Sequence, residues 1–183
     1  GKIFKALILR VKVPTKKFNG NSYKFLENAA ILKVLDSIEP FGITYTKLPV
    51  NKFGEVNPNA LEEVIKDGTG LISIMMVNNE VGTINPINNL IKIAEEKNIP
   101  FHSDAVQALG KTPLSVKDVG ADYLSFSGHK FYGPKGVGFL YKKNEAKLNP
   151  LIIGGEQESQ FRAGTENVSG IVGLAEAVRL SIQ

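Results

Sequence analysis

From about residue 27, stretches with a helical spacing of apolar residues alternate with short apolar runs. Helices are predicted over Glu27–Glu39, from Asn57 through Ile65, over Ile84–Lys97 and over Gly164–Ile182. Strands are predicted over Ile43–Pro49, Gly70–Val77, Ile99–Ser103, Ala121–Ser127 and Val137–Tyr141. Because strands separated by helices usually pair in parallel, we expect an α/β fold with a mostly parallel sheet flanked by helices on both faces.

Polar side chains follow three of these strands at the point where each strand ends. They are Asn78-Asn79, Asp104 and Ser127–Lys130. Ligands of open parallel sheets bind at the carboxyl ends of the strands. The pattern therefore predicts one binding site built from three segments that are far apart in the sequence.

Two of these residues have complementary chemistry. Lys130 and Asp104 are the minimum that a protein must supply to pyridoxal phosphate: a lysine that forms a Schiff base, and a carboxylate that keeps the pyridine nitrogen protonated. Each residue alone has a plainer interpretation, Asp104 as a helix cap and Lys130 as a solvated surface charge.

Four motifs together resemble the cysteine desulfurases of the NifS/IscS type, which are class V aminotransferases of the fold-type I group. They are Met76-Val77-Asn78-Asn79-Glu80-Val81-Gly82, Ser103-Asp104-Ala105-Val106-Gln107, Ser127-Gly128-His129-Lys130-Phe131-Tyr132-Gly133-Pro134-Lys135-Gly136-Val137-Gly138 and Arg162-Ala163-Gly164-Thr165-Glu166-Asn167. The similarity runs in order from about Asn21 to Ile182. It implies that residues 21–183 form part of a pyridoxal-phosphate-transferase large domain.

The resemblance implies a role for each matching residue. Lys130 is the Schiff-base lysine and moves the substrate α-proton, and Asp104 is the partner of the pyridine nitrogen. Gln107 donates to the phenolic oxygen of the cofactor, and Asn79 contacts the same edge of the ring. The cofactor phosphate is held by Ser127 and His129, and by Thr165 lent to a neighbouring subunit, which implies a homodimer or larger assembly.

The sequence departs from the family in four places. Residues 1–20 lack the glycine-rich loop with an Ala-Thr pair that holds the phosphate, and Asn28 stands where the family stacks a histidine on the ring. The glycine-rich stretch that begins at Gly154 differs by one glycine and one arginine. The domain with the sulfur-accepting cysteine loop and the carboxylate-binding arginine has no counterpart, and the position of Arg162 does not match that arginine.

These departures leave three interpretations open. One is a desulfurase-type domain that is inactive alone and works with a chain that supplies the cysteine loop. Another is a non-catalytic pseudoenzyme that serves as a structural or binding subunit. The third is another class V activity, such as an aminotransferase or a selenocysteine lyase.

Composition narrows the function classes further. The 183 residues contain no cysteine, which excludes a disulfide framework and a cysteine nucleophile within them, and the two histidines are too few for an ordinary histidine metal site. No apolar run approaches the roughly 18 residues that span a bilayer. We therefore expect an intracellular protein, cytoplasmic or organellar, without a metal site or a membrane partner.

The net charge of +4 is concentrated at the N-terminus. Residues 1–24 contain seven lysine and arginine residues and no acid, so the rest of the chain carries a net charge of −3. We interpret residues 1–20 as an unassigned basic arm and expect a solvated end. This arm is the one route to a nucleic-acid partner, and no aromatic interleaving or nucleic-acid motif supports it.

Overall fold

The computed structural model describes residues 9–11, 29–38 and 42–182. In these ranges the chain forms two sheets. A small sheet pairs β1 (Leu9–Val11) with β2 (Thr46–Leu48) in parallel. β1 lies inside the predicted basic arm, so these three residues form a strand where a solvated end was expected.

The main sheet has four strands in the order β3-β4-β5-β6. β3 (Ile72–Ser73), β4 (Phe101–Asp104) and β5 (Tyr123–Ser127) are parallel, and β6 (Gly138–Lys142) runs antiparallel to β5. The ladder of β3 continues beyond its two regular residues, because the amides of Ile74 and Met76 donate to the carbonyls of His102 and Asp104 at 3.1 and 2.9 Å. The mostly parallel α/β sheet predicted from the sequence is confirmed.

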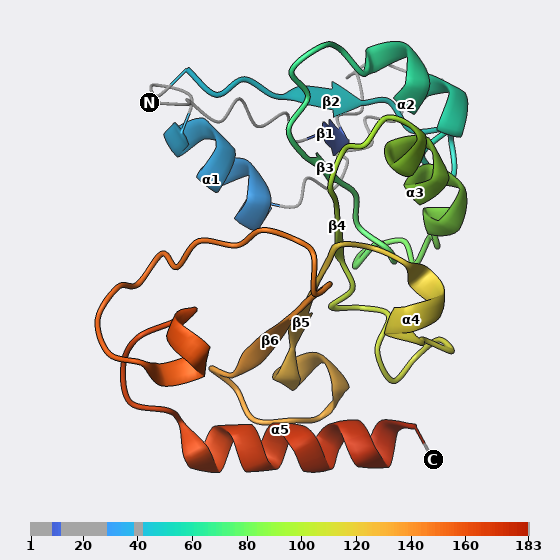
Figure 1. The fold of residues 1–183 in the computed structure, drawn as a ribbon. Helices are drawn as coiled ribbons and strands as arrows, with labels where there is room; N and C mark the ends of the chain where they lie inside the picture. The colour runs from blue at the N-terminus through green and yellow to red at the C-terminus, as the bar shows by residue number, and fades with distance from the viewer. Residues whose placement is uncertain (1–8, 12–28, 39–41, 183) are drawn as a thin grey trace.

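Four of the described helices lie where the apolar spacing predicts them, with shorter bounds, and the short helix at Val116–Val119 was not predicted. The described helices are α1 (Ala29–Ile38), α2 (Pro58–Val64), α3 (Ile87–Glu96), α4 (Val116–Val119) and α5 (Val168–Ser181). In the view of Figure 1, α2, α3 and α4 gather on one side of β4, α1 lies on the other side, and α5 runs beneath the turn that follows β5.

Local chemistry explains most of the differences in bounds. Asn57 caps α2 as predicted, since its side chain accepts from the amide of Asn59 at 2.9 Å. The helix predicted from Ile84 begins at Ile87 instead, because Pro86 precedes it and Ile84 pairs with Val77 in an isolated antiparallel bridge. The last predicted helix begins only at Val168, where Asn167 caps it by accepting from the amide of Gly170.

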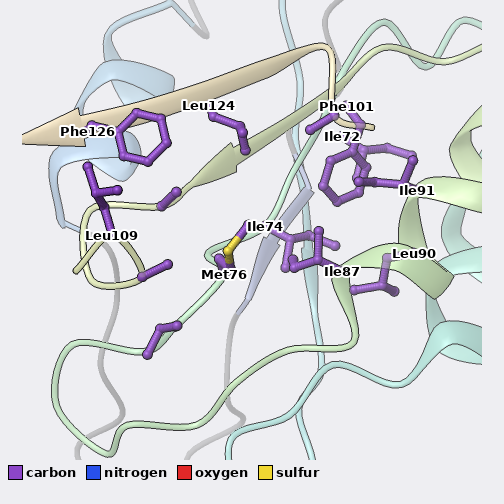
Figure 2. Packing of buried hydrophobic residues seen from close by; sticks show 14 of the residues in the cluster. Ile72, Ile74, Met76, Ile87, Leu90, Ile91, Phe101, Leu109, Leu124 and Phe126 are labelled. Atoms are coloured by element: carbon purple, nitrogen blue, oxygen red, sulfur yellow. The ribbon is translucent and has the colours of Figure 1, made fainter. Parts of the chain in front are cut away.

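The core lies between the main sheet and the helices on one of its faces. Phe101, Leu124 and Phe126 point into it from β4 and β5, and Leu90 and Ile91 enter it from α3 (Figure 2). Side chains that alternate with these face the other way and are only partly buried. Within the described ranges, no helix is both long and apolar enough to cross a membrane.

Candidate active site

The partly buried face of the main sheet carries a row of polar side chains that leads to the carboxyl ends of the strands. Ser73 pairs with His102 in the β3–β4 register, and Asp104 pairs with Ser125 in the β4–β5 register. Side chains two residues apart on a strand share a face, so Ser127 follows Ser125 on this side. The sheet thus carries Asp104 and Ser127 on one face at neighbouring strand ends.

His102 lies at the centre of this row. Its Nδ1 is 2.8 Å from Oγ of Ser73, and its Nε2 is 3.2 Å from Oγ of Ser125. Burial lowers the pKa of His102, and the nearby charge of Asp104 opposes this with a smaller effect in the raising direction. The imidazole is therefore neutral at physiological pH.

Asp104 is the last residue of β4 and is partly buried. Its Oδ1 accepts a hydrogen bond from the amide of Val106 at 3.0 Å, which fixes the turn that follows the strand. Asp104 therefore does not cap a helix, which was its plainer interpretation. The segment 105–111 that follows it contains turns and no regular α-helix.

Ser127 ends β5, and His129 and Lys130 lie in the 3₁₀ turn η2 (Gly128–Phe131). Oγ of Ser127 is 2.9 Å from Nδ1 of His129, and the side chains of His129 and Lys130 are exposed. A backbone hydrogen bond fixes the start of the turn, because the amide of Gly128 donates to the carbonyl of Val137 at 2.9 Å. A Cβ atom on Gly128 would lie 2.7 Å from Cδ1 of Leu174, so glycine lets the turn pack against α5.

Asn79 and Gln107 lie in the turns that follow β3 and β4. Asn79 is exposed in the turn that Asn78 closes, where Oδ1 of Asn78 accepts from the amide of Glu80 at 2.9 Å. Gln107 is partly buried, and its Oε1 accepts a hydrogen bond from Nζ of Lys111. This contact uses the oxygen of the Gln107 amide, and the predicted hydrogen bond to the cofactor would come from its nitrogen.

The remaining predicted positions lie further along the chain or outside the described ranges. Thr165 is exposed in the segment that leads into α5, and Arg162 is exposed in the same segment. Asn28 lies outside the described residues. A cavity of about 580 Å³ beside the start of α3 is lined by none of the predicted site residues. No group of three histidine or acidic residues among the described ones is arranged to hold a metal ion.

The donor set at the strand ends fits pyridoxal phosphate. A carboxylate at the end of β4 suits a protonated ring nitrogen, and a hydroxyl beside an imidazole at the end of β5 suits a phosphate. Lys130 comes one residue after this imidazole.

The bridge between Ser73, His102 and Ser125 was not predicted from the sequence. A signal was present: His102 lies two residues before Asp104 on a strand, and the period of two places both on one face. The serines belong to other strands, and only the register shows that they reach the imidazole.

Comparison with known proteins identifies the family. Residues 23–183 match the model of the class V aminotransferases. The cysteine desulfurase IscS of Dictyoglomus turgidum is 51% identical over 157 residues, which cover 86% of this chain and 40% of that protein. Among solved structures, a NifS-like protein superposes with a TM-score of 0.86 at 38% identity over 99% of this chain and 47% of its own. The structure of SspA in complex with cysteine gives a TM-score of 0.80 at 42% identity over 84% of this chain and 45% of its own.

The chain thus spans less than half the length of these relatives. The match nevertheless covers nearly all of the described residues and includes the four motifs around Asn79, Asp104, Lys130 and Thr165. The sequence match and the shared sheet agree, and the chain belongs to the class V aminotransferases, a pyridoxal-phosphate-dependent family, as a relative of the IscS and NifS cysteine desulfurases.

Proposed function

We propose that these residues form the pyridoxal-phosphate site of a cysteine-desulfurase-like protein that mobilises sulfur from L-cysteine for iron-sulfur cluster or thio-cofactor synthesis. The observation that carries the proposal is the pairing of β4 with β5, which puts Asp104 and Ser127 on one face at neighbouring strand ends. Lys130 follows Ser127 by three residues. The relatedness to cysteine desulfurases supports this choice of chemistry.

In this site each residue has a defined role. Pyridoxal phosphate, when bound, supplies an electron sink that stabilises negative charge on the α-carbon of an amino acid. Asp104 holds the ring nitrogen protonated, and Lys130 anchors the cofactor and carries a proton to and from the substrate α-carbon. Asn79 and Gln107 orient the ring through its phenolic oxygen.

Ser127 and His129 hold the phosphate. Their side chains already lie 2.9 Å apart and share a hydrogen bond. When a phosphate replaces this mutual contact, the hydroxyl and one ring nitrogen can each donate to a phosphate oxygen. Hydrogen bonds to a charged group contribute about 1.5–3 kcal/mol each. The two residues thus supply phosphate contacts from the end of β5 and from the turn that follows it.

Thr165 completes the phosphate site of a second copy, so the functional unit is a homodimer. Two observations favour this arrangement. Thr165 is exposed, and the nearby loop exposes large apolar side chains, with Leu151 94% and Ile153 85% accessible. Apolar groups of this size gain about 1.5–3 kcal/mol each when a partner buries them.

The sulfur-accepting step needs a thiol from outside these residues, because they contain no cysteine. A thiolate is the nucleophile that would take the sulfur of the substrate. The thiol-bearing loop therefore belongs to another segment or to a partner chain. A non-catalytic subunit and a different class V activity remain the alternatives, and cofactor binding separates the first of them from the proposal.

The test is titration of the protein with pyridoxal phosphate, followed by its visible absorbance. We expect a saturable band that Lys130→Ala abolishes and that Lys135→Ala, which removes an exposed lysine of the same loop, retains. Borohydride reduction followed by peptide mass mapping should place the cofactor on Lys130. A band that survives in Lys130→Ala contradicts the assignment of this lysine, and no band at saturating cofactor favours the non-catalytic subunit.

Desulfuration itself is tested by adding the thiol. Protein loaded with cofactor should release sulfide from L-cysteine in the presence of an external thiol reductant, and Lys130→Ala should reduce the rate by at least about 100-fold, which is within the range of a lost general acid or base. Consumption of L-cysteine as an amino donor without sulfide release would favour the aminotransferase alternative.

A further inference from the structure

Ser73, His102 and Ser125 form a hydrogen-bonded bridge across β3, β4 and β5. The two ring nitrogens of His102 lie 2.8 Å from Oγ of Ser73 and 3.2 Å from Oγ of Ser125. A neutral imidazole has one donor and one acceptor, and a serine hydroxyl can serve as either. Both sides of the ring are therefore satisfied without a charge on it.

Asp104 lies directly beside this bridge. It is two residues after His102 on the same strand face, and its register partner is Ser125. The influence of its charge on His102 is second to burial, and burial lowers the pKa of the imidazole. The ring next to the carboxylate is thus neutral at physiological pH.

The other ionisable side chains on this face are Tyr123, which pairs with His102, and Lys142, which pairs with Tyr123. Burial, and then Asp122, raises the pKa of Tyr123, whose hydroxyl donates to the carbonyl of Lys147. The ammonium of Lys142 donates to the carbonyls of Lys143, Asn144 and Ala146 at 3.0, 3.1 and 2.9 Å. Among the described register partners, Asp104 is the charge that bears on His102.

We propose that His102 is a positioning residue for Asp104: it fills the sheet face beside the carboxylate with a neutral ring held by two serines. This inference rests on the proposed function, because the carboxylate acts there on the cationic ring nitrogen of pyridoxal phosphate. A cation at position 102 would compete with that nitrogen for Asp104. A neutral imidazole occupies the same space and leaves the attraction to the cofactor intact.

The first test is the pH dependence of pyridoxal-phosphate binding, measured as the dissociation constant between pH 5 and pH 8. Protonation of His102 at low pH should weaken binding to the wild-type protein. The ratio of the constants at pH 5 and pH 8 should be about tenfold larger for the wild type than for His102→Asn, since one pKa unit of interaction is a factor of ten. The effect of pH on every other group of the protein and on the cofactor is common to both proteins and cancels in the comparison.

Ser73→Ala is the matched control. It removes one hydrogen bond of the bridge but keeps the titratable ring, so it should retain the steep pH profile of the wild type. A purely structural role of His102 would instead change the affinity of His102→Asn by the same factor at every pH. That result would overturn the inference.

The second test needs no cofactor. The chain has only two histidines, so NMR resolves two imidazole titrations, and His129→Ala assigns them. Asp104→Asn should lower the pKa of His102 further, because it removes the raising influence. An unchanged His102 titration in Asp104→Asn would overturn the coupling.

The two proposals fail in different ways. If the wild-type protein binds no pyridoxal phosphate at any pH, the proposed function is wrong, and the inferred role of His102 in positioning Asp104 is wrong as well. Binding with an equal pH profile in the wild type and His102→Asn overturns only the role of His102.

Discussion

Oγ of Ser127 lies 2.9 Å from Nδ1 of His129, across the point where β5 passes into a 3₁₀ turn. A strand side chain and a turn side chain therefore present a hydroxyl and an imidazole at one place. The turn keeps this shape because Gly128 fits against α5, where a Cβ atom would lie 2.7 Å from Leu174. The pair can be tested separately from the rest of the proposed site, because only the phosphate of the cofactor is assigned to it.

Removing either member of this pair should weaken pyridoxal phosphate more than pyridoxal, which lacks the phosphate. We expect Ser127→Ala and His129→Ala each to raise the dissociation constant of pyridoxal phosphate about 10- to 100-fold, the equivalent of one hydrogen bond to a charged group. The constant for pyridoxal should change little. Calorimetric or absorbance titration with both ligands measures the ratio.

Ser115→Ala is the control for this experiment, because Ser115 is exposed, precedes α4 without a side-chain cap hydrogen bond and is not one of the predicted site residues. It should change neither constant. If Ser127→Ala and His129→Ala weaken the binding of pyridoxal phosphate and of pyridoxal by the same factor, the pair does not bind the phosphate.

The stability of the protein without cofactor should fall on acidification through His102. Its pKa is lower in the folded state than the roughly 6.5 of a free histidine, so the unfolded chain binds the proton more tightly. The contribution is fully present above pH 6.5 and is lost as the pH falls from there toward the folded-state pKa, with a slope of at most about 1.4 kcal/mol per pH unit. Urea unfolding between pH 5 and pH 8 measures it.

His102→Asn should flatten this part of the curve, although it also lowers the stability at pH 8 by removing the bridge. The difference between the two curves isolates the histidine, because the carboxylates that titrate at lower pH are common to both. Parallel curves for the two proteins would show that His102 titrates alike in the folded and the unfolded states.

The register of β5 and β6 depends on a glycine. Gly138 pairs with Ser127, and a Cβ atom at this position would lie 2.5 Å from the carbonyl oxygen of Phe126. Gly138→Ala should cost about 1–3 kcal/mol or more, because backbone must move to relieve the contact. Gly136→Ala is the control: a Cβ atom there meets nothing within 4 Å, and only its φ of +78° costs about 1–2 kcal/mol.

Urea unfolding compares the two alanine variants. Gly138→Ala should also weaken pyridoxal-phosphate binding, since the displaced backbone carries Ser127, whereas Gly136→Ala should lose stability with a smaller change in affinity. Equal affinity in both variants would mean that the β5–β6 register does not position the phosphate contact.

The order of the helices and strands, apart from β1 and α4, was predictable because each has a clear local signal. The continuous apolar run at Gly70–Val77 and the separation of predicted strands by helices predicted a parallel sheet, and Asn57 marked the start of α2. The short 3₁₀ turn that carries Lys130 and the antiparallel direction of β6 were not predicted. Both depend on the close approach of Gly128 and Gly138 to other segments, which a single sequence does not show.

The candidate site was predictable in part for the same reason. Strand-end residues such as Asp104 and Ser127 follow from the position of each strand along the chain. The contribution of Ser73 and Ser125 to the setting of Asp104 follows only from the pairing of three strands. Residues 1–20 were interpreted as a solvated arm because of their basic charge. Leu9–Val11 forms a strand there by pairing with β2, and Leu9 pairs with Thr46, 37 residues later. A local charge pattern does not indicate such a distant partner.

The last prediction concerns the proposed homodimer. The wild-type protein should self-associate, and replacing both Leu151 and Ile153 by serine should weaken that association. These side chains are 94% and 85% exposed in the single chain, and burying the two in a partner gains about 3 kcal/mol or more. Their loss should raise the dissociation constant of the dimer at least about 100-fold, as measured by sedimentation equilibrium.

Phe53→Ser, which removes a side chain that is 66% exposed on another segment, should leave the association unchanged. A wild-type protein that stays monomeric at all concentrations would exclude a second copy as the partner of Thr165, and a dimer insensitive to the double substitution would place the interface on another surface.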